Sequence, residues 1–376
     1  MSEFAAGPAG RIERVRALMA ERGYDAIVVR DEANLRWLTG VKGVFDYTFE
    51  FPHAAFITAD QCLFHTDSRY LNSFEENTSA GSPWVYDMDE GTISGWVAGK
   101  IAANKCRVCA VEDDMQINFY QGIQRGLEDR SVACMLPLMH DDIRKMRAIK
   151  DAEEIELMRH AQSITDAAFQ HMLGYIKPGM TEKQVRNELE NFMFANGADS
   201  LAFGSIVASG PNTANPHALP SDRVIEKGDF VLMDYGAGYC DYRSDMTRAV
   251  VMGEPTQEQL DLYALVRRAH EECVAAIHPG VEGNDIFKLS KKIIGDAGYG
   301  DYYNHGLGHG VGIDIHELPN FNRSKNIIEV GSVITMEPGV YLPGVGGVRL
   351  EDYGVVTENG YEPFTKTPHD LHVIDC

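Results

Sequence analysis

The sequence lacks long apolar runs, has few cysteines and has too few basic residues to balance its acids. No apolar run in its 376 residues approaches the roughly 18 that a membrane-spanning helix needs. The first residues also lack the basic and apolar regions of a signal peptide. The net charge of −22 leaves no basic patch for nucleic acid. We therefore expect a cytoplasmic protein with no membrane or nucleic-acid partner.

Several common enzyme motifs are also missing. The sequence has no GxSxG nucleophile elbow and no HExxH zinc helix, and the glycines between 306 and 312 lack the GxGxxG spacing of a dinucleotide loop. The 7 cysteines, an odd number, fit reduced thiols. Cys106 and Cys109 form a CxxC pair without two further ligands nearby, so we do not expect them to bind zinc.

The length predicts about two domains of ~150 residues, and the 44% apolar content is enough for globular cores. In the first part, helical patterns alternate with short apolar runs, which predicts an α/β domain. This part has no phosphate loop and no cluster of acids or histidines, so we expect it to shape the substrate site or to contact a second subunit. We place the domains at 1–145 and 146–376. The expected elements are helices at 11–21 and 93–104, strands at 25–30, 54–58, 62–65 and 108–112, and a long helix at 151–175 that opens the second domain.

The second domain repeats its own plan. Residues 224–245 read as a strand, a glycine-rich turn and a second strand, with Asp234 and Asp245 near the strand centres. Residues 327–351 repeat this pattern with Glu337 and Glu351. An Ile-x-Pro-Gly helix end and a His-x-Leu-Pro loop precede each hairpin in the same order. We predict two helix-plus-hairpin halves around a pseudo-two-fold axis, with sheets facing the axis and helices outside.

The four carboxylates predict a two-metal site. Brought together in buried strands they repel one another unless cations lie between them. The alternative is a set of salt bridges with Arg243 and Arg349, which would leave two of the acids unpaired. Oxygen-rich ligands favour Mn²⁺, Mg²⁺, Fe²⁺ or Co²⁺. Two such ions about 3.5–4 Å apart would acidify a bridging water, and the resulting hydroxide could attack a carbonyl carbon.

Three histidines add to this prediction. His309 lies between glycines and has no counterpart in the first half, so we expect it to bind one of the two metals only. His217 and His316 occupy the two equivalent His-x-Leu-Pro loops. We expect them to hydrogen-bond the developing oxyanion and to give a proton to the leaving amine. Packing of both rings in surface loops is the alternative.

These residues carry a family resemblance. The second domain resembles the pita-bread metallopeptidases, which include methionine aminopeptidase, aminopeptidase P and Xaa-Pro dipeptidase. The first domain resembles the creatinase/prolidase N-terminal domain, which favours the last two members. The matching stretches are SGPNTANPH at 209–217, MDYGAGYCDYRSDMTR at 233–248, HGLGHGVGIDIHELP at 305–319, MEPGVY at 336–341 and GVRLED at 347–352, with RWLTGVKG at 36–43 and TDSRY at 66–70 in the first domain.

The resemblance implies an α/β (α+β) pita-bread fold and hydrolysis of Xaa-Pro bonds in small peptides. It implies Mn²⁺ as the metal, with Co²⁺, Zn²⁺ or Fe²⁺ as alternatives, and a homodimer. Asp241 replaces a glycine of the family motif, which could alter the turn or the pocket. The implied site residues are the ligands Asp234, Asp245, His309, Glu337 and Glu351, with Asp245 and Glu351 bridging, then His217, His316 and Glu337 in catalysis, and His305, Tyr341 and Arg349 near the substrate.

Two readings compete with the peptidase. A relative of the same fold could act on a non-peptide substrate, as creatinase, ectoine hydrolase or a sulfonium lyase does. The fold could also serve as a binding module without catalysis. Retention of all five ligands argues against the binding module but does not separate peptides from other substrates. Dipeptidase and aminopeptidase activity also remain open alternatives.

Overall fold

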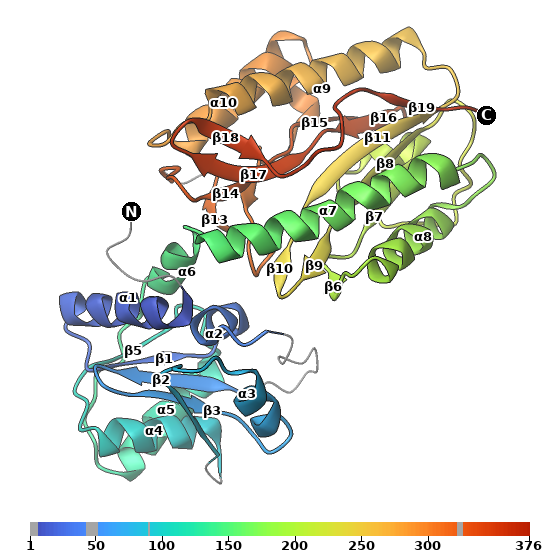
Figure 1. Ribbon diagram of the computed structural model, residues 1–376. Helices are drawn as coiled ribbons and strands as arrows, with labels where there is room; N and C mark the ends of the chain where they lie inside the picture. Colours follow the sequence, from blue (N-terminus) through green and yellow to red (C-terminus); the bar gives the residue numbers. More distant parts are fainter. Residues whose placement is uncertain (1–6, 43–51, 89–90, 322–325) are drawn as a thin grey trace. The chain divides into compact units, whose positions relative to one another are not determined.

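The computed structural model describes residues 7–42, 52–88, 91–321 and 326–376, which form two compact units at 1–147 and 148–376 (Figure 1). Gly43, the last residue of the first N-terminal motif, and the first six residues lie outside the described ranges. Among the helices that are described, none combines the length and the apolar character needed to cross a membrane.

The first unit is an α/β layer structure, as its alternating pattern predicts. Its sheet has the strand order β4-β3-β2-β1-β5, and β1 pairs antiparallel with β2 and parallel with β5. Apolar residues of α4 and α5 pack against one face of this sheet. The elements are α1 (Gly7–Arg22), β1 (Ala26–Val29), α2 (Glu32–Thr39), β2 (Ala54–Thr58), β3 (Cys62–His65), α3 (Leu71–Asn77), β4 (Trp84–Asp87), α4 (Ile93–Ala103), β5 (Cys109–Val111), α5 (Ile117–Asp129) and α6 (Asp142–Arg147).

Two helix pairs frame the second unit. The chain between the helices of each pair turns at a glycine with positive φ, Gly179 in the first pair and Gly280 in the second, where a side chain would be strained. Three of the four helices begin with a capping box, at Asp151, Thr181 and Thr256. The helices are α7 (Ala152–Tyr175), α8 (Glu182–Ala195), α9 (Gln257–Ala276) and α10 (Gly283–Asp296).

Two sheets lie between these helix pairs (Figure 1). The first has the order β19-β11-β8-β7 and the second the order β13-β12-β14-β17-β18. The predicted duplication appears as two long antiparallel pairs, β8 with β11 and β14 with β17. The strands are β6 (Ser200–Leu201), β7 (Ile206–Ser209), β8 (Phe230–Tyr235), β9 (Ala237–Tyr239), β10 (Tyr242–Arg243), β11 (Met246–Met252), β12 (His309–Gly310), β13 (Glu317–Asn320), β14 (Val333–Met336), β15 (Gly339–Leu342), β16 (Gly346–Arg349), β17 (Asp352–Thr357), β18 (Gly360–Pro363) and β19 (His372–Ile374), with 3₁₀ turns η1 (Gly210–Ala214) and η2 (Gly300–Tyr302).

The expectation that each acid lies near the centre of its strand is wrong. Each hairpin is interrupted by a short inner hairpin, β9–β10 in the first half and β15–β16 in the second, so the acids fall at the strand ends. In the first half, the two arms of the hairpin come very close together just beyond Asp234. A Cβ on Gly236 would lie 1.9 Å from the carbonyl oxygen of Ser244, so only glycine fits.

Candidate metal centre

Four carboxylates lie where the long strands break. Asp234 is the penultimate residue of β8, and Asp245 directly precedes β11. Glu337 directly follows β14, and Glu351 directly precedes β17. Asp234, Asp245 and Glu351 are buried, with 8%, 4% and 2% of their surface exposed. The strand breaks therefore bring two acids of each half close to one another.

His309 connects the acids of the two halves. Its Nε2 lies 3.6 Å from Asp245 Oδ2 and 3.5 Å from Glu337 Oε1. Ligand atoms of Asp245, His309 and Glu351 all lie within 4.8 Å of one another. The Nδ1 atom faces the carbonyl oxygen of Gly310 at 3.0 Å, so it carries the proton and donates it. The Nε2 lone pair is thus directed at the carboxylates, which is the tautomer a metal ligand needs.

Burial and mutual repulsion disfavour the charged acids when no cation is present. Burial, followed by repulsion from Glu351, raises the pKa of Asp245 well above its ordinary value. Burial and the charge of Glu337 do the same to the pKa of Glu351. Burial raises the pKa of Glu337 to about 7 and lowers the pKa of His309 to about 3. A neutral imidazole beside carboxylates that need a counter-charge is a donor set that fits divalent cations.

Asp234 has one cationic partner in the described residues. A nitrogen of the buried Arg349 guanidinium pairs with its Oδ2, whereas its Oδ1 is buried without a hydrogen-bond partner in the described part of the chain. Arg243 instead donates to the carbonyl oxygens of Ile313 and Leu201. The salt-bridge alternative therefore holds for one acid only, and the free Oδ1 is an atom that a cation could use.

Three of the expected substrate-site residues form one chain of hydrogen bonds. Arg349 Nη1 donates to the Tyr341 hydroxyl at 2.7 Å, and the hydroxyl lies 2.9 Å from His305 Nε2. The other ring nitrogen of His305 faces the carbonyl oxygen of Gly306 at 2.7 Å and donates to it. The Tyr341 hydroxyl therefore donates its own proton to Nε2. Burial, followed by the charge of Arg349, lowers the pKa of His305 to about 3, so this ring is neutral.

The two loop histidines lie beside this centre. The rings of His316 and His309 meet edge to face, with centroids 4.3 Å apart. His217 is exposed, and the carbonyl oxygen of the preceding Pro216 accepts a hydrogen bond from Arg349 Nη1 at 3.3 Å. Partial burial, followed by the charge of His217, lowers the pKa of His316. The structure thus gathers every residue of the expected site around one group of acids.

Sequence reasoning missed two threonines, one of which holds an acid and the other His309. Thr247 Oγ1 donates to Glu351 Oε2 at 2.6 Å and accepts from Arg349 Nε at 2.9 Å. Thr335 Oγ1 accepts the backbone N–H of His309 at 3.0 Å. Both are fully buried in apolar strands. A hydroxyl in such a strand is the signal that could have identified them, because buried polar groups need partners.

Asp241, which replaces a glycine of the family motif, occupies a tight turn. Cys240 and Asp241 have φ values of 47° and 71°, and the flanking Tyr239 and Tyr242 pair across the β9–β10 hairpin. Two consecutive residues with positive φ define a type I′ turn, which glycine, asparagine and aspartate tolerate best. The substitution therefore keeps the turn.

The fold and the acid-rich centre are those of a metal-dependent hydrolase. Residues 156–358 match the model of metallopeptidase family M24, and residues 11–149 match the creatinase/prolidase N-terminal domain. The chain belongs to metallopeptidase family M24, and this assignment confirms the resemblance and the predicted pita-bread architecture. It is 36% identical to the uncharacterized peptidase YqhT of Bacillus subtilis over 97% of this chain and 100% of that protein. It is 41% identical to a Xaa-Pro dipeptidase of Pyrococcus horikoshii over 96% of this chain and 98% of that protein.

Solved structures agree with this assignment. A Xaa-Pro dipeptidase from Bacillus anthracis superposes with a TM-score of 0.89 at 35% identity, covering 98% of this chain and 100% of that one. An X-Pro aminopeptidase from Thermotoga maritima gives a TM-score of 0.85 at 31% identity, covering 97% and 100%. The chain is therefore an enzyme of the metallopeptidase class.

Proposed function

We propose that this enzyme hydrolyses the amide bond that precedes proline in small peptides, using two divalent cations. The observation that carries the proposal is the geometry of His309, whose Nε2 lone pair faces carboxylates from both halves of a duplicated fold. The relatives supply the substrate class, because those with assigned activities include Xaa-Pro dipeptidases and an X-Pro aminopeptidase.

The residues that would hold the cations are Asp234, Asp245, His309, Glu337 and Glu351. Ligand atoms of Asp245 and Glu351 lie within 4.8 Å of each other and of His309. The family resemblance implies that these two carboxylates would be the bridging ligands. Two bound cations would supply Lewis acidity, which lowers the pKa of water and polarises the carbonyl group of the substrate. Carboxylate-rich ligation favours Mn²⁺, with Co²⁺, Fe²⁺ or Zn²⁺ as alternatives.

The other side chains have separate tasks in this proposal. Glu337 is the group that would accept and return a proton, a role that the family resemblance implies and that a carboxylate beside the cations can perform. His316 and His217 contact the substrate, and hydrogen bonds from their rings would stabilise the oxyanion. Tyr341 and Arg349 hold His305 and Asp234 in place through the hydrogen bonds described above. We also propose a homodimer, an assignment that rests on the family resemblance alone.

Peptide hydrolysis with added Mn²⁺ tests the proposal. We expect turnover of Xaa-Pro dipeptides or Xaa-Pro-Yaa tripeptides and little turnover of matched Xaa-Ala peptides. Comparing dipeptides with tripeptides decides between dipeptidase and aminopeptidase activity. Asp245→Asn should lose both bound metal and turnover. Turnover of ectoine or creatine without turnover of either peptide class would refute the proposed substrate.

A further inference from the structure

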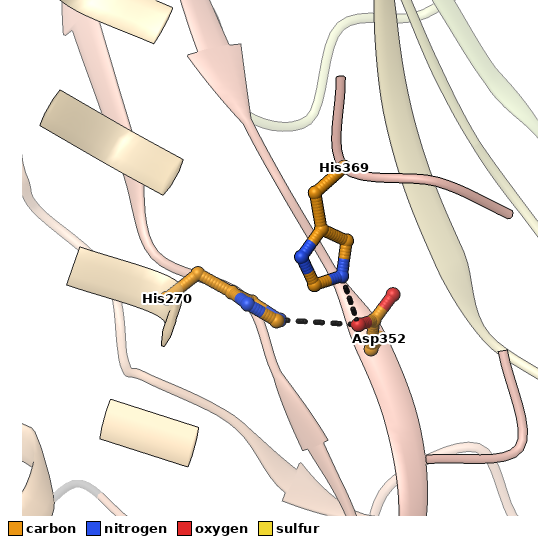
Figure 2. A group of neighbouring side chains, drawn as sticks. All are labelled: His270, Asp352 and His369. Atoms are coloured by element: carbon orange, nitrogen blue, oxygen red, sulfur yellow. Dashed lines mark hydrogen bonds and ion pairs between the residues drawn. The ribbon is translucent and has the colours of Figure 1, made fainter. Parts of the chain in front are cut away.

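A second group of potential metal ligands lies outside the candidate metal centre. It consists of His270 from α9, Asp352 at the start of β17 and His369 from the C-terminal segment (Figure 2). One ligand atom from each residue lies within 4.8 Å of the other two. Asp352 follows Glu351 directly, and successive side chains of extended chain point to opposite faces. The group is therefore separate from the five proposed ligands.

His270 is the most unusual member of this group. It is 1% exposed, and neither ring nitrogen has a hydrogen-bond partner within the described residues. Its Nε2 faces Asp352 Oδ2 at 3.6 Å, which is too long for a hydrogen bond (Figure 2). Burial lowers the pKa of the ring to about 4, so it is neutral and keeps a lone pair. A buried imidazole without a partner carries an uncompensated desolvation penalty unless something binds it.

Asp352 divides its two oxygens between different partners. Oδ1 accepts a hydrogen bond from the buried Arg248 guanidinium at 2.6 Å. Oδ2 faces the imidazoles, at 2.6 Å from His369 Nε2 and 3.6 Å from His270 Nε2. Carboxylates that bind metals are commonly held by a hydrogen bond to the other oxygen. Arg248 therefore fixes the orientation of Asp352 and leaves Oδ2 directed at the two rings.

His369 makes the group accessible to a metal ion from solvent. Its side chain is 27% exposed, unlike those of His270 and Asp352. The C-terminal segment that carries it is tied down by Arg248, which donates to the carbonyl oxygens of Thr367 and Pro368. The third ligand is thus both held in place and accessible, and a water molecule could complete the coordination from the same side.

We propose that His270, Asp352 and His369 form a separate mononuclear site for a transition-metal ion of the Zn²⁺ type. Two imidazole nitrogens, one carboxylate oxygen and an open position are a donor set that Zn²⁺ binds tetrahedrally, at about 2.0–2.2 Å from each atom. Alkaline-earth ions, which require oxygen-rich ligation, should not bind there. The site contains none of the proposed catalytic residues, and so it stands independently of the proposed function.

Metal counting after Zn²⁺ addition tests the site. Protein loaded with Mn²⁺ is incubated with excess Zn²⁺, freed of unbound ions by gel filtration and analysed for Mn plus Zn per chain. We expect one more ion per chain in the wild type than in His270→Gln or His369→Gln. Glutamine keeps polar atoms near Asp352 but is a poor ligand for Zn²⁺. His278→Gln is the matched control, because His278 is exposed in the turn that follows α9 and lies outside the group.

The metal content per chain decides the proposal. The proposal is overturned if the wild type and both variants hold the same number of ions, whether or not an additional ion is bound. If His270→Gln fails to fold, His369→Gln decides the question, because its side chain lies partly at the surface. With Co²⁺ in place of Zn²⁺, the wild type should show the visible absorption of a tetrahedral ion, and this signal should be lost in His369→Gln.

Discussion

At the scale of single residues, the two histidines of the HGLGHG segment show how the sequence selects a tautomer. His305 and His309 each donate from Nδ1 to the carbonyl oxygen of the glycine that follows. Burial lowers the pKa of both rings to about 3, so both are neutral and expose an Nε2 lone pair, one toward Tyr341 and the other toward the acids. The same local geometry thus lets His305 accept a hydrogen bond from Tyr341 and lets His309 act as a potential metal ligand.

His316 should contribute to turnover rather than to metal binding. It lies beside His309 without belonging to the acid group. We expect His316→Ala to keep its metal and to lose about 100-fold or more in kcat, a typical loss for a group that transfers a proton or stabilises charge. Steady-state kinetics and metal analysis measure both quantities. His278→Ala provides an exposed histidine as control, and unchanged kcat in His316→Ala would assign that ring a packing role only.

Glu337 should make the metal-free protein sensitive to pH. Its folded-state pKa of about 7 lies above the ordinary 4.5 of an unfolded chain. The folded state therefore binds more protons between these values, and stability is lost as pH rises. We expect Glu337→Gln to gain stability over the wild type from pH 4.5 to 7, reaching about 3 kcal/mol. Buried histidines change stability with pH in the opposite direction. Their contribution is the same in the wild type and in the variant, so it cancels when the two stabilities are subtracted.

Chemical denaturation of both metal-free proteins across this pH range measures the effect. Repeating the series with Mn²⁺ is the control, because bound cations should remove the penalty on the charged carboxylate. A stability difference that does not change with pH would show that Glu337 is ionised in both states.

At the scale of elements, a buried ion pair holds the loop that carries His316. Lys150 Nζ lies 3.0 Å from Glu317 Oε2, with side chains 1% and 6% exposed. Glu317 Oε1 also accepts the backbone N–H of Asp314 at 3.0 Å. A side chain on Gly312 would collide with this carboxylate. The residue just before α7 thereby fixes the loop next to the candidate metal centre.

Removal of one partner of the Lys150–Glu317 ion pair should lower the stability of the protein. We expect Lys150→Met to destabilise the protein by about 3–5 kcal/mol, because it leaves a buried carboxylate unpaired. The His316 loop should loosen, with a lower kcat and an unchanged metal content. The double variant Lys150→Met/Glu317→Met should regain part of the stability, since no charge remains buried. Full stability of the single variant in urea denaturation would show that the pair makes no net contribution.

The elements themselves were largely predictable from local patterns. The long helix after Asp151, the capping boxes and the repeated hairpins follow from periodicity and turn chemistry. The strand breaks beside Asp234 and Glu337 were not predicted, because they depend on close approaches inside each hairpin, such as that of Gly236 to Ser244, which the apolar pattern does not record. The group around His270 was missed for a different reason. Its members lie on a helix, a strand and a terminal segment, and no spacing in the sequence links them.

At the scale of the whole molecule, polar contacts join the two halves of the second unit across the candidate metal centre. Arg349 pairs with Asp234, Thr247 with Glu351 and Arg248 with Asp352. Each contact links a residue of the first half to a residue of the second. Metal ions bound between the same strands would add to these links, so the stability of the second unit should depend on the metal.

Removal of the metal should therefore loosen the strands of the second unit that carry the acids. Chelation leaves buried carboxylates from both halves facing one another, and repulsion opposes their approach. We expect faster amide hydrogen exchange in β8, β11, β14 and β17, together with a lower melting temperature. The five-stranded sheet of residues 1–147 contributes no proposed ligand and serves as an internal control. Hydrogen exchange followed by mass spectrometry before and after chelation measures both regions. Exchange that rises equally in both units, or in neither, would show that the cations are not what joins the two halves.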